Sequence, residues 1–187
     1  MRAILPIAFS CVAVLALAGC DTIPGSSASA EAPHAMTGLP GDWQVGASEM
    51  HDAEGRAFTV CTLLRSAQDG RRFWIAATPS TVSGDLYLGV RSPELPAIEG
   101  RADRKALVTV DGIAYRPMRA QQAGDALSMA IAPEEAPAFL DAFAKGYQLA
   151  VTAGDLPGFS IGVDLRGSAN GRREWKKCIE RELKPAS

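Results

Sequence analysis

Residues 56–65 read RAFTVCTLLR, and this stretch predicts the type of fold. Its side chains alternate in a two-residue period rich in β-branched and apolar types, which is typical of a strand with a buried face. The following residues end in Asp69-Gly70, a dipeptide that favours the tight turn of a β-hairpin. Residues 71–78, RRFWIAAT, supply the returning strand. The two stretches therefore predict an antiparallel hairpin.

The same signals recur further along the chain. A second Asp-Gly turn at 111–112 separates residues 105–110 from residues 113–119 and predicts another hairpin. Further alternating stretches predict strands at residues 85–91, 126–131, 147–152 and 158–165.

Residues 134–145 change to the helical period and carry an apolar stripe. Pro137 is compatible with a helix only in its first turn, where Glu134 and Glu135 also suit the helix dipole. Gly146 is expected to end this helix in a left-handed conformation.

A second helix is predicted from Ser168, its expected N-cap, to about Leu183. Trp175 and Cys178 lie on its apolar face. Its outer face is basic and carries Arg172, Arg173, Lys176, Lys177, Arg181 and Lys184. Such a face suits either anionic lipid headgroups or solvent; interspersed glutamates favour solvent.

The order of strands, helix, strands and helix predicts an α+β fold. We expect mainly antiparallel β structure, as a sandwich or a curled sheet, with two helices packed on it. The chain has 187 residues, enough for one domain, which we place at residues 41–187. A net charge of −2 gives no electrostatic basis for nucleic-acid binding.

The first residues resemble a secretory signal, because Met1-Arg2 precedes an apolar run over residues 3–18. The run ends in Leu17-Ala18-Gly19-Cys20, which resembles the lipobox of bacterial lipoproteins. The resemblance implies that residues 1–19 are a signal peptide and that Cys20 carries lipid, palmitate included. Several acyl chains would anchor the protein stably to a membrane. Asp21 resembles an inner-membrane retention signal, which slightly favours the inner over the outer membrane.

Residues 21–40 are rich in Ser, Ala, Pro and Gly and lack aromatic residues. This composition predicts a disordered tether behind the lipidated Cys20. A lipid-anchored domain on such a tether is expected in the periplasm of the cell envelope.

The cysteines divide by position. Cys11 lies in the predicted signal and Cys20 is the predicted lipid site, which leaves Cys61 and Cys178 in the domain. In an oxidising compartment, two cysteines at apolar positions favour one disulfide between the ends of the domain. Two separate buried thiols are the alternative.

Catalytic and metal-binding patterns are weak. Residues 158–162, GFSIG, match the nucleophile-elbow string, but they lie inside a predicted strand and no His follows them. The histidines, His34 and His51, are expected in the tether and in a loop; His51 has acidic neighbours, and a solvated loop is favoured over a cation site there. We therefore predict no metal, no cofactor and no enzymatic activity.

The three tryptophans, Trp43, Trp74 and Trp175, are expected to anchor the core.

Several short motifs resemble those of the invasion-associated locus B family of exported bacterial proteins. They are GDWQV at 41–45, the strand at Cys61, VDG at 110–112, residues 139–144 before Gly146, and FSIGVDLRG at 159–167. The family's mid-domain Pro-Leu-Gly-Val segment and its Gly-Cys pair are absent from residues 41–187. The resemblance implies an envelope role associated with host cells and no catalytic residues.

Two functions are expected from these patterns. The first is a non-catalytic envelope lipoprotein that binds a protein or an envelope ligand in an accessory or host-interaction role. The alternative is a periplasmic protease or lysozyme inhibitor, because small β-rich lipoproteins with an early Trp and one disulfide resemble those inhibitors. Such inhibitors insert a loop or strand into an enzyme cleft.

Overall fold

The computed structural model describes residues 37–39, 42–52, 54–79 and 86–183. The predicted signal peptide, Cys20 and Asp21 lie outside these residues. The strands are β1 (Thr37–Leu39), β2 (Trp43–His51), β3 (Ala57–Ser66), β4 (Arg72–Ala77), β5 (Leu86–Arg91), β6 (Ile98–Asp103), β7 (Ala106–Val110), β8 (Ile113–Tyr115), β9 (Arg119–Gly124), β10 (Ala126–Ile131), β11 (Gln148–Ala153) and β12 (Ser160–Asp164). The helices are α1 (Ala136–Lys145) and α2 (Ser168–Glu182).

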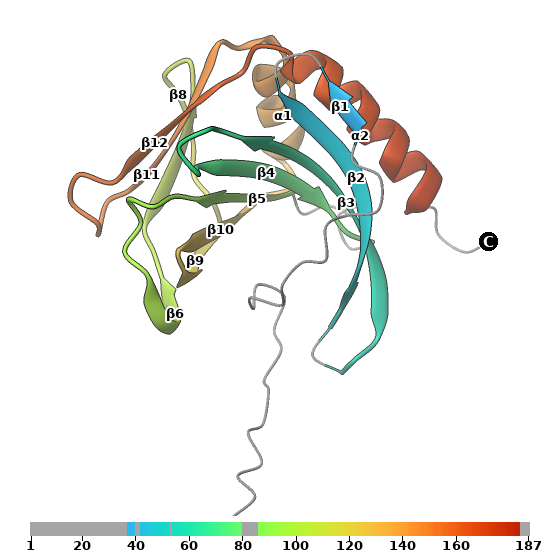
Figure 1. Cartoon of the computed structure of the whole chain (residues 1–187). Coiled ribbons are helices and arrows are strands. Elements are labelled where there is room, and N and C mark those ends of the chain that lie inside the picture. Colours follow the sequence, from blue (N-terminus) through green and yellow to red (C-terminus); the bar gives the residue numbers. More distant parts are fainter. Residues whose placement is uncertain (1–36, 40–41, 53, 80–85, 184–187) are drawn as a thin grey trace, which may run out of the picture.

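Within the described residues, the strands form two antiparallel sheets (Figure 1). The large sheet has eight strands in the order β1-β2-β3-β4-β5-β10-β9-β6, and the small sheet has four in the order β12-β11-β7-β8. Helix α2 packs on β2, β3 and α1. The predicted α+β fold, mainly antiparallel β with two helices packed on it, is confirmed.

Aromatic rings connect the layers of the core. Trp43 of β2 meets Phe143 of α1 edge-on, with ring centroids 5.3 Å apart, and Phe73 of β4 stacks on the same ring at 6.1 Å. Phe139, one turn earlier on α1, packs edge-on against Tyr115 of β8 at 5.2 Å. The large sheet, the helix and the small sheet therefore share one continuous apolar core.

A disulfide joins Cys61 of β3 to Cys178 of α2, as predicted, with the two Cα atoms 6.0 Å apart. The indole N–H of Trp175 donates a hydrogen bond of 2.8 Å to the carbonyl of Cys61. Gly171 permits the close approach of α2 to β3, since a Cβ there would lie 2.9 Å from Leu63 Cδ1. The last helix is thus fixed to the first hairpin by a covalent bond, a hydrogen bond and close packing.

Both Asp-Gly hairpins form, with one correction. Asp111 and Gly112 have φ of 48° and 84°, the left-handed pair that a two-residue hairpin turn requires. The single strand predicted over residues 113–119 is wrong, because β8 ends at Tyr115. Pro117 has no N–H to donate to a neighbouring strand, and the N–H of Met118 donates to the carbonyl of Ala130 in the large sheet. The chain therefore changes sheets at this point.

The predicted helix ends also differ from the structure. Gly146 has extended backbone with φ of −77°; it is required because a Cβ would lie 2.7 Å from Val110 Cγ1. Gly167, with φ of 82°, precedes α2 as its N-cap, whereas the Ser168 hydroxyl donates to the Phe143 carbonyl at 2.7 Å. Glu134 and Glu135 precede α1, since Ala136 is its first residue. At Gly146 and at Ser168, a contact with a residue distant in sequence replaces the helix-capping interaction that the sequence predicts.

The start of the domain contains two further differences. Thr37–Leu39, which the sequence places in the tether, pair with β2 as the short edge strand β1. The loop expected at His51 is instead the end of β2, a strand that the sequence analysis does not predict. β2 has no regular apolar alternation, and its pairing with β3 along its whole length holds it as a strand.

Replacing both Cys61 and Cys178 by Ala is expected to lower the free energy of unfolding by about 2–5 kcal/mol. The bond spans a sequence separation of 117 residues and restricts the unfolded chain accordingly. Equilibrium urea unfolding of the double variant and of the oxidised wild type measures the loss. A difference below about 0.5 kcal/mol, which is usual for a neutral surface change, would contradict the structural role of the disulfide.

Candidate functional site

The structure places the described residues of these weak catalytic and metal-binding patterns on separate strands, His51 on β2 and Ser160 on β12. Among the described residues, no group of three or more His, Cys, Asp and Glu side chains could hold a metal ion. Ser160 of the GFSIG string is the exposed first residue of β12. Asp52 and Glu54 instead pair with Arg56, at 2.6 and 2.9 Å. These contacts fasten the turn between β2 and β3.

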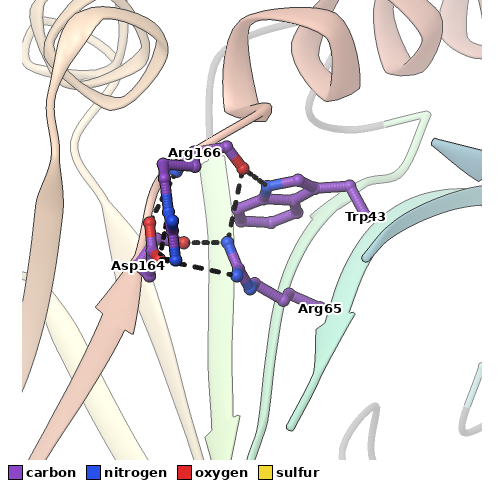
Figure 2. A network of polar contacts seen from close by, with 4 residues as sticks. All are labelled: Trp43, Arg65, Asp164 and Arg166. Carbon is purple, nitrogen blue, oxygen red and sulfur yellow. Dashed lines mark hydrogen bonds and ion pairs between the residues drawn. The ribbon is translucent and has the colours of Figure 1, made fainter. Parts of the chain in front are cut away.

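A polar network connects the large sheet to the segment that follows β12 (Figure 2). The Arg65 guanidinium lies 5.5 Å from the centre of the Trp43 ring and donates to the Asp164 carbonyl. The Trp43 indole N–H donates to the Arg166 carbonyl at 2.9 Å, and Arg166 Nε donates to the Asp164 carboxylate at 2.7 Å. The network therefore holds the two sheets together at β2, β3 and β12.

A second network joins the sheets at β9 and the loop after β11. Gln122 is fully buried; its amide N–H groups donate to the carbonyls of Pro96 and Gly124, and its amide oxygen accepts from Arg104 at 2.8 Å. Arg104 also pairs with Asp155 at 3.2 Å. In both networks the buried donors are bound to protein acceptors, which indicates a structural role.

Hydrogen bonds in these networks stabilise the ionised carboxylates. Donation from the side chain and backbone of Arg166 holds the pKa of Asp164 below its ordinary value of 3.8. The backbone N–H of Lys105 and, after it, the Arg104 side chain lower the pKa of Asp155. Both carboxylates therefore contribute stability when charged.

The large sheet has a second face, opposite the helices, which we call the outer face. The strand registers place side chains from seven strands in one row across it. The row consists of Gln44, Leu64, Trp74, Gly89, Ser128, Gln121 and Asp103. Four residues of this row are polar, which distinguishes the outer face from the apolar inner face.

The indole of Trp74 packs directly against Gly89 at the centre of this row. A Cβ at Gly89 would fall 2.0 Å from ring atoms Cε2 and Cζ2, so only glycine leaves room for the indole. Trp43 and Trp175 are buried, as expected of core anchors, but Trp74 is only half-buried and lies outside the core. The expectation that all three tryptophans anchor the core is therefore wrong for Trp74, because β4 alternates and directs Phe73 inward instead.

Arginines flank the Trp74 row on the outer face. Arg72 and Arg91 occupy directly opposite positions on β4 and β5, and Arg119 lies at the start of β9. Arg91 pairs with Asp125 at 2.8 Å. Among the described residues, no hydrogen bond or ion pair holds the guanidinium of Arg72 or Arg119. The outer face therefore combines a half-exposed indole with unpaired cations and is the candidate binding surface.

The basic side of α2 has a different character, because its charges are matched locally. Arg172 pairs with Asp141 of α1 at 2.7 Å, and Lys177 pairs with Glu174 at 2.8 Å. Lys176 lies 3.8 Å from Glu180. These pairs fit the solvated helix that the interspersed glutamates indicate.

Comparison of the chain with protein-family models, with curated proteins and with solved structures found no match. The resemblances to bacterial lipoproteins and to the invasion-associated locus B family therefore stay predictions. In the described part of the chain, no helix has the length and apolar character needed to span a membrane.

One sequence signal points to the outer face. Gly89 interrupts an otherwise regular alternating strand, LYLGVR, and such a glycine indicates close approach of another group. The remaining members of the row follow only from the registers, since β2, β6 and β9 are not evident from periodicity.

Substituting Gly89→Ala is expected to displace the Trp74 ring and to cost about 1–3 kcal/mol of stability, as overpacking does. The measurements are the urea unfolding midpoint and the tryptophan fluorescence spectrum. Gly162→Ala is the matched control, because its Cβ would lie 3.4 Å from Gln148 Nε2, the nearest atom. Equal stability of the two variants would contradict the packing of Trp74 on Gly89.

Acid is expected to weaken the two networks together. Because the folded-state pKa of Asp164 and of Asp155 lies below the ordinary value of 3.8, their stabilisation is present above that pH. It is lost as the pH falls through the lowered values. The double variant Asp155→Asn/Asp164→Asn should therefore lose less stability than the wild type on acidification below about pH 4.

Urea unfolding midpoints measured from pH 7 to pH 2 test this expectation. The variant Asp125→Asn is the control, because it removes a carboxylate that belongs to neither network. An acid response of the double variant as steep as that of the control would refute the assignment.

Proposed function

We propose that this chain is a non-catalytic lipoprotein of the bacterial cell envelope whose domain binds a protein or envelope ligand. The observation that carries the proposal is the disulfide between Cys61 and Cys178, whose cysteines are both buried. Structural disulfides persist in oxidising compartments such as the periplasm and are rare in the cytosol. The disulfide thus supports the compartment that the lipobox at Leu17-Ala18-Gly19-Cys20 predicts.

The distribution of polar groups supports binding as the role of the domain. The half-buried arginines Arg65 and Arg104 are bound within the protein, whereas no contact among the described residues holds the guanidinium of Arg72 on the outer face. A half-exposed indole beside unpaired cations suits recognition of a ligand. A surface of this kind needs no catalytic group.

A protease or lysozyme inhibitor is the second candidate, and the hairpin of β2 and β3 favours it. Among the described residues, β1 pairs with β2 as far as Val45, and β4 pairs with β3 from Cys61 onward. The paired residues beyond these points, 46–51 of β2 and 57–60 of β3, therefore extend as an arm from the sheet (Figure 1). The Asp52 carboxylate accepts from the backbone N–H of Arg56 at 2.8 Å and fastens the tip.

A fastened β-arm can enter an enzyme cleft with little loss of conformational entropy. Stoichiometric inhibition of a lysozyme or a periplasmic protease by the purified chain would favour this second function over the first.

Metabolic labelling with palmitate in an expressing bacterium tests the proposed anchoring. The wild-type chain is expected to take up label and to fractionate with membranes, and Cys20→Ala is expected to do neither, because the substitution removes the thiol that accepts lipid. Cys11→Ala is the matched control, since it removes a cysteine from the predicted signal peptide and leaves the lipobox intact. Labelling of Cys20→Ala at the wild-type level would overturn the proposal.

A further inference from the structure

We infer that the outer face of the large sheet binds an acidic glycan, with a sugar ring stacked on Trp74 and the acidic group of the glycan held by Arg72. The inference rests on the binding role proposed above and names the chemical class of its ligand. It depends on three features of the outer face: the position of the indole, the neutral polar groups in the rows around it, and the charge of its arginines.

The Trp74 indole is placed to stack against a flat, polar ring. The indole packs against Gly89, and the next residue along the row is the exposed Ser128. The neighbouring row places Ala76, Tyr87 and Ala130 in that order, so a second aromatic ring lies between two small side chains on this face. The π-face of an aromatic ring is negative, and it attracts the weakly positive C–H groups on the flat side of a sugar.

Neutral hydrogen-bonding side chains lie around the indole. Gln44 and Gln121 belong to its row, and Thr62 lies in the neighbouring row opposite Ala76. Amide and hydroxyl groups both donate and accept, which matches the hydroxyl groups of a sugar. A purely apolar partner would leave these groups without hydrogen bonds, and their presence therefore favours a polyhydroxylated ligand.

The charge of the outer face selects an acidic ligand. Arg72 and Arg91 are directly opposite each other, an arrangement of like charges that disfavours the sheet unless an anion offsets it. Asp125 offsets Arg91, and Arg72 has no such partner among the described residues. The chain as a whole carries a net charge of −2, so attraction of an anion depends on this local excess of cations.

The spacing of the two contacts fits one sugar unit. Arg72 and Trp74 are two residues apart on β4 and therefore point to the same face, about 7 Å apart along the strand. A sugar ring centred on the indole places its exocyclic acidic group within reach of a long arginine side chain. A guanidinium binds carboxylate and phosphate alike through paired N–H donors, and the chemistry of the site is therefore an acidic group on a sugar.

Binding of purified full-length protein to a galacturonic acid hexamer tests the inference, with maltohexaose as the neutral hexamer of similar size. Isothermal titration calorimetry measures affinity, and tryptophan fluorescence reports on Trp74, since Trp43 and Trp175 are buried. We expect the acidic hexamer to bind and to quench fluorescence, and maltohexaose to bind at least about tenfold more weakly, as loss of a charge-assisted contact implies.

Three variants locate the site. Trp74→Ala and Arg72→Gln should each weaken binding by about tenfold or more, because each removes one of the two main contacts. Ser128→Phe changes an exposed residue next to Gly89 and should block the indole without altering the core; it keeps the test valid if Trp74→Ala does not fold. Arg173→Gln on α2 removes the same charge elsewhere and should bind like the wild type.

Several results would overturn the inference. They are absence of binding to the acidic hexamer, unchanged affinity in folded Trp74→Ala or in Ser128→Phe, and an equal loss in Arg173→Gln. Equally tight binding of polyglutamate would also overturn it, because that result would show attraction to any polyanion. A phosphorylated mannose oligomer distinguishes phosphate from carboxylate; preference for either supports an acidic glycan. Palmitate labelling is independent of these measurements, and failure of the glycan site therefore differs from failure of the proposed anchoring.

Discussion

Cys61 lies near the middle of β3 and Cys178 in the third turn of α2, and the bond between them holds the last helix of the domain against its first hairpin. The indole of Trp175 donates to the backbone of the same β3 residue, and Gly171 removes the side chain that would keep the helix away. Because α2 covers β2 and β3, the aromatic rings beneath it can meet those of α1 and the small sheet. The enclosed core and the free outer face both follow from this contact.

The networks of Arg65 and Arg104 also hold the two sheets together, at points away from the disulfide. Each brings a carboxylate of the small-sheet region to an arginine that contacts the large sheet. Their partial burial makes these contacts geometrically specific, because a removed partner would leave a shielded charge or amide unsatisfied. They also give the charges clustered at these two places a structural role.

The sequence pattern predicts those elements whose conformation depends mainly on residues that are close together in the chain. The Asp-Gly turns and the alternating strands β3, β4 and β10 are of this kind. β6 and β9, with sequences IEGRAD and RAQQAG, have little apolar periodicity, and pairing with their neighbours orders them. Local patterns predict that Gly146 and Ser168 cap helix ends, but contacts with Val110 and Phe143 determine their conformations. For the same reason the outer face could not be assembled from sequence, since its row depends on six strand registers.

Contacts between the two ends of the domain affect the order in which it folds. Trp43 donates to the carbonyl of Arg166, 123 residues later, and Trp175 to that of Cys61, 114 residues earlier. A nascent chain that stops short of α2 lacks the helix that covers β2 and β3 in the folded domain. The native core is therefore completed only when the whole sequence is available, and contacts of such long sequence separation are formed slowly. Until then, β2 and β3 expose a surface on which a chaperone or a second nascent chain can bind.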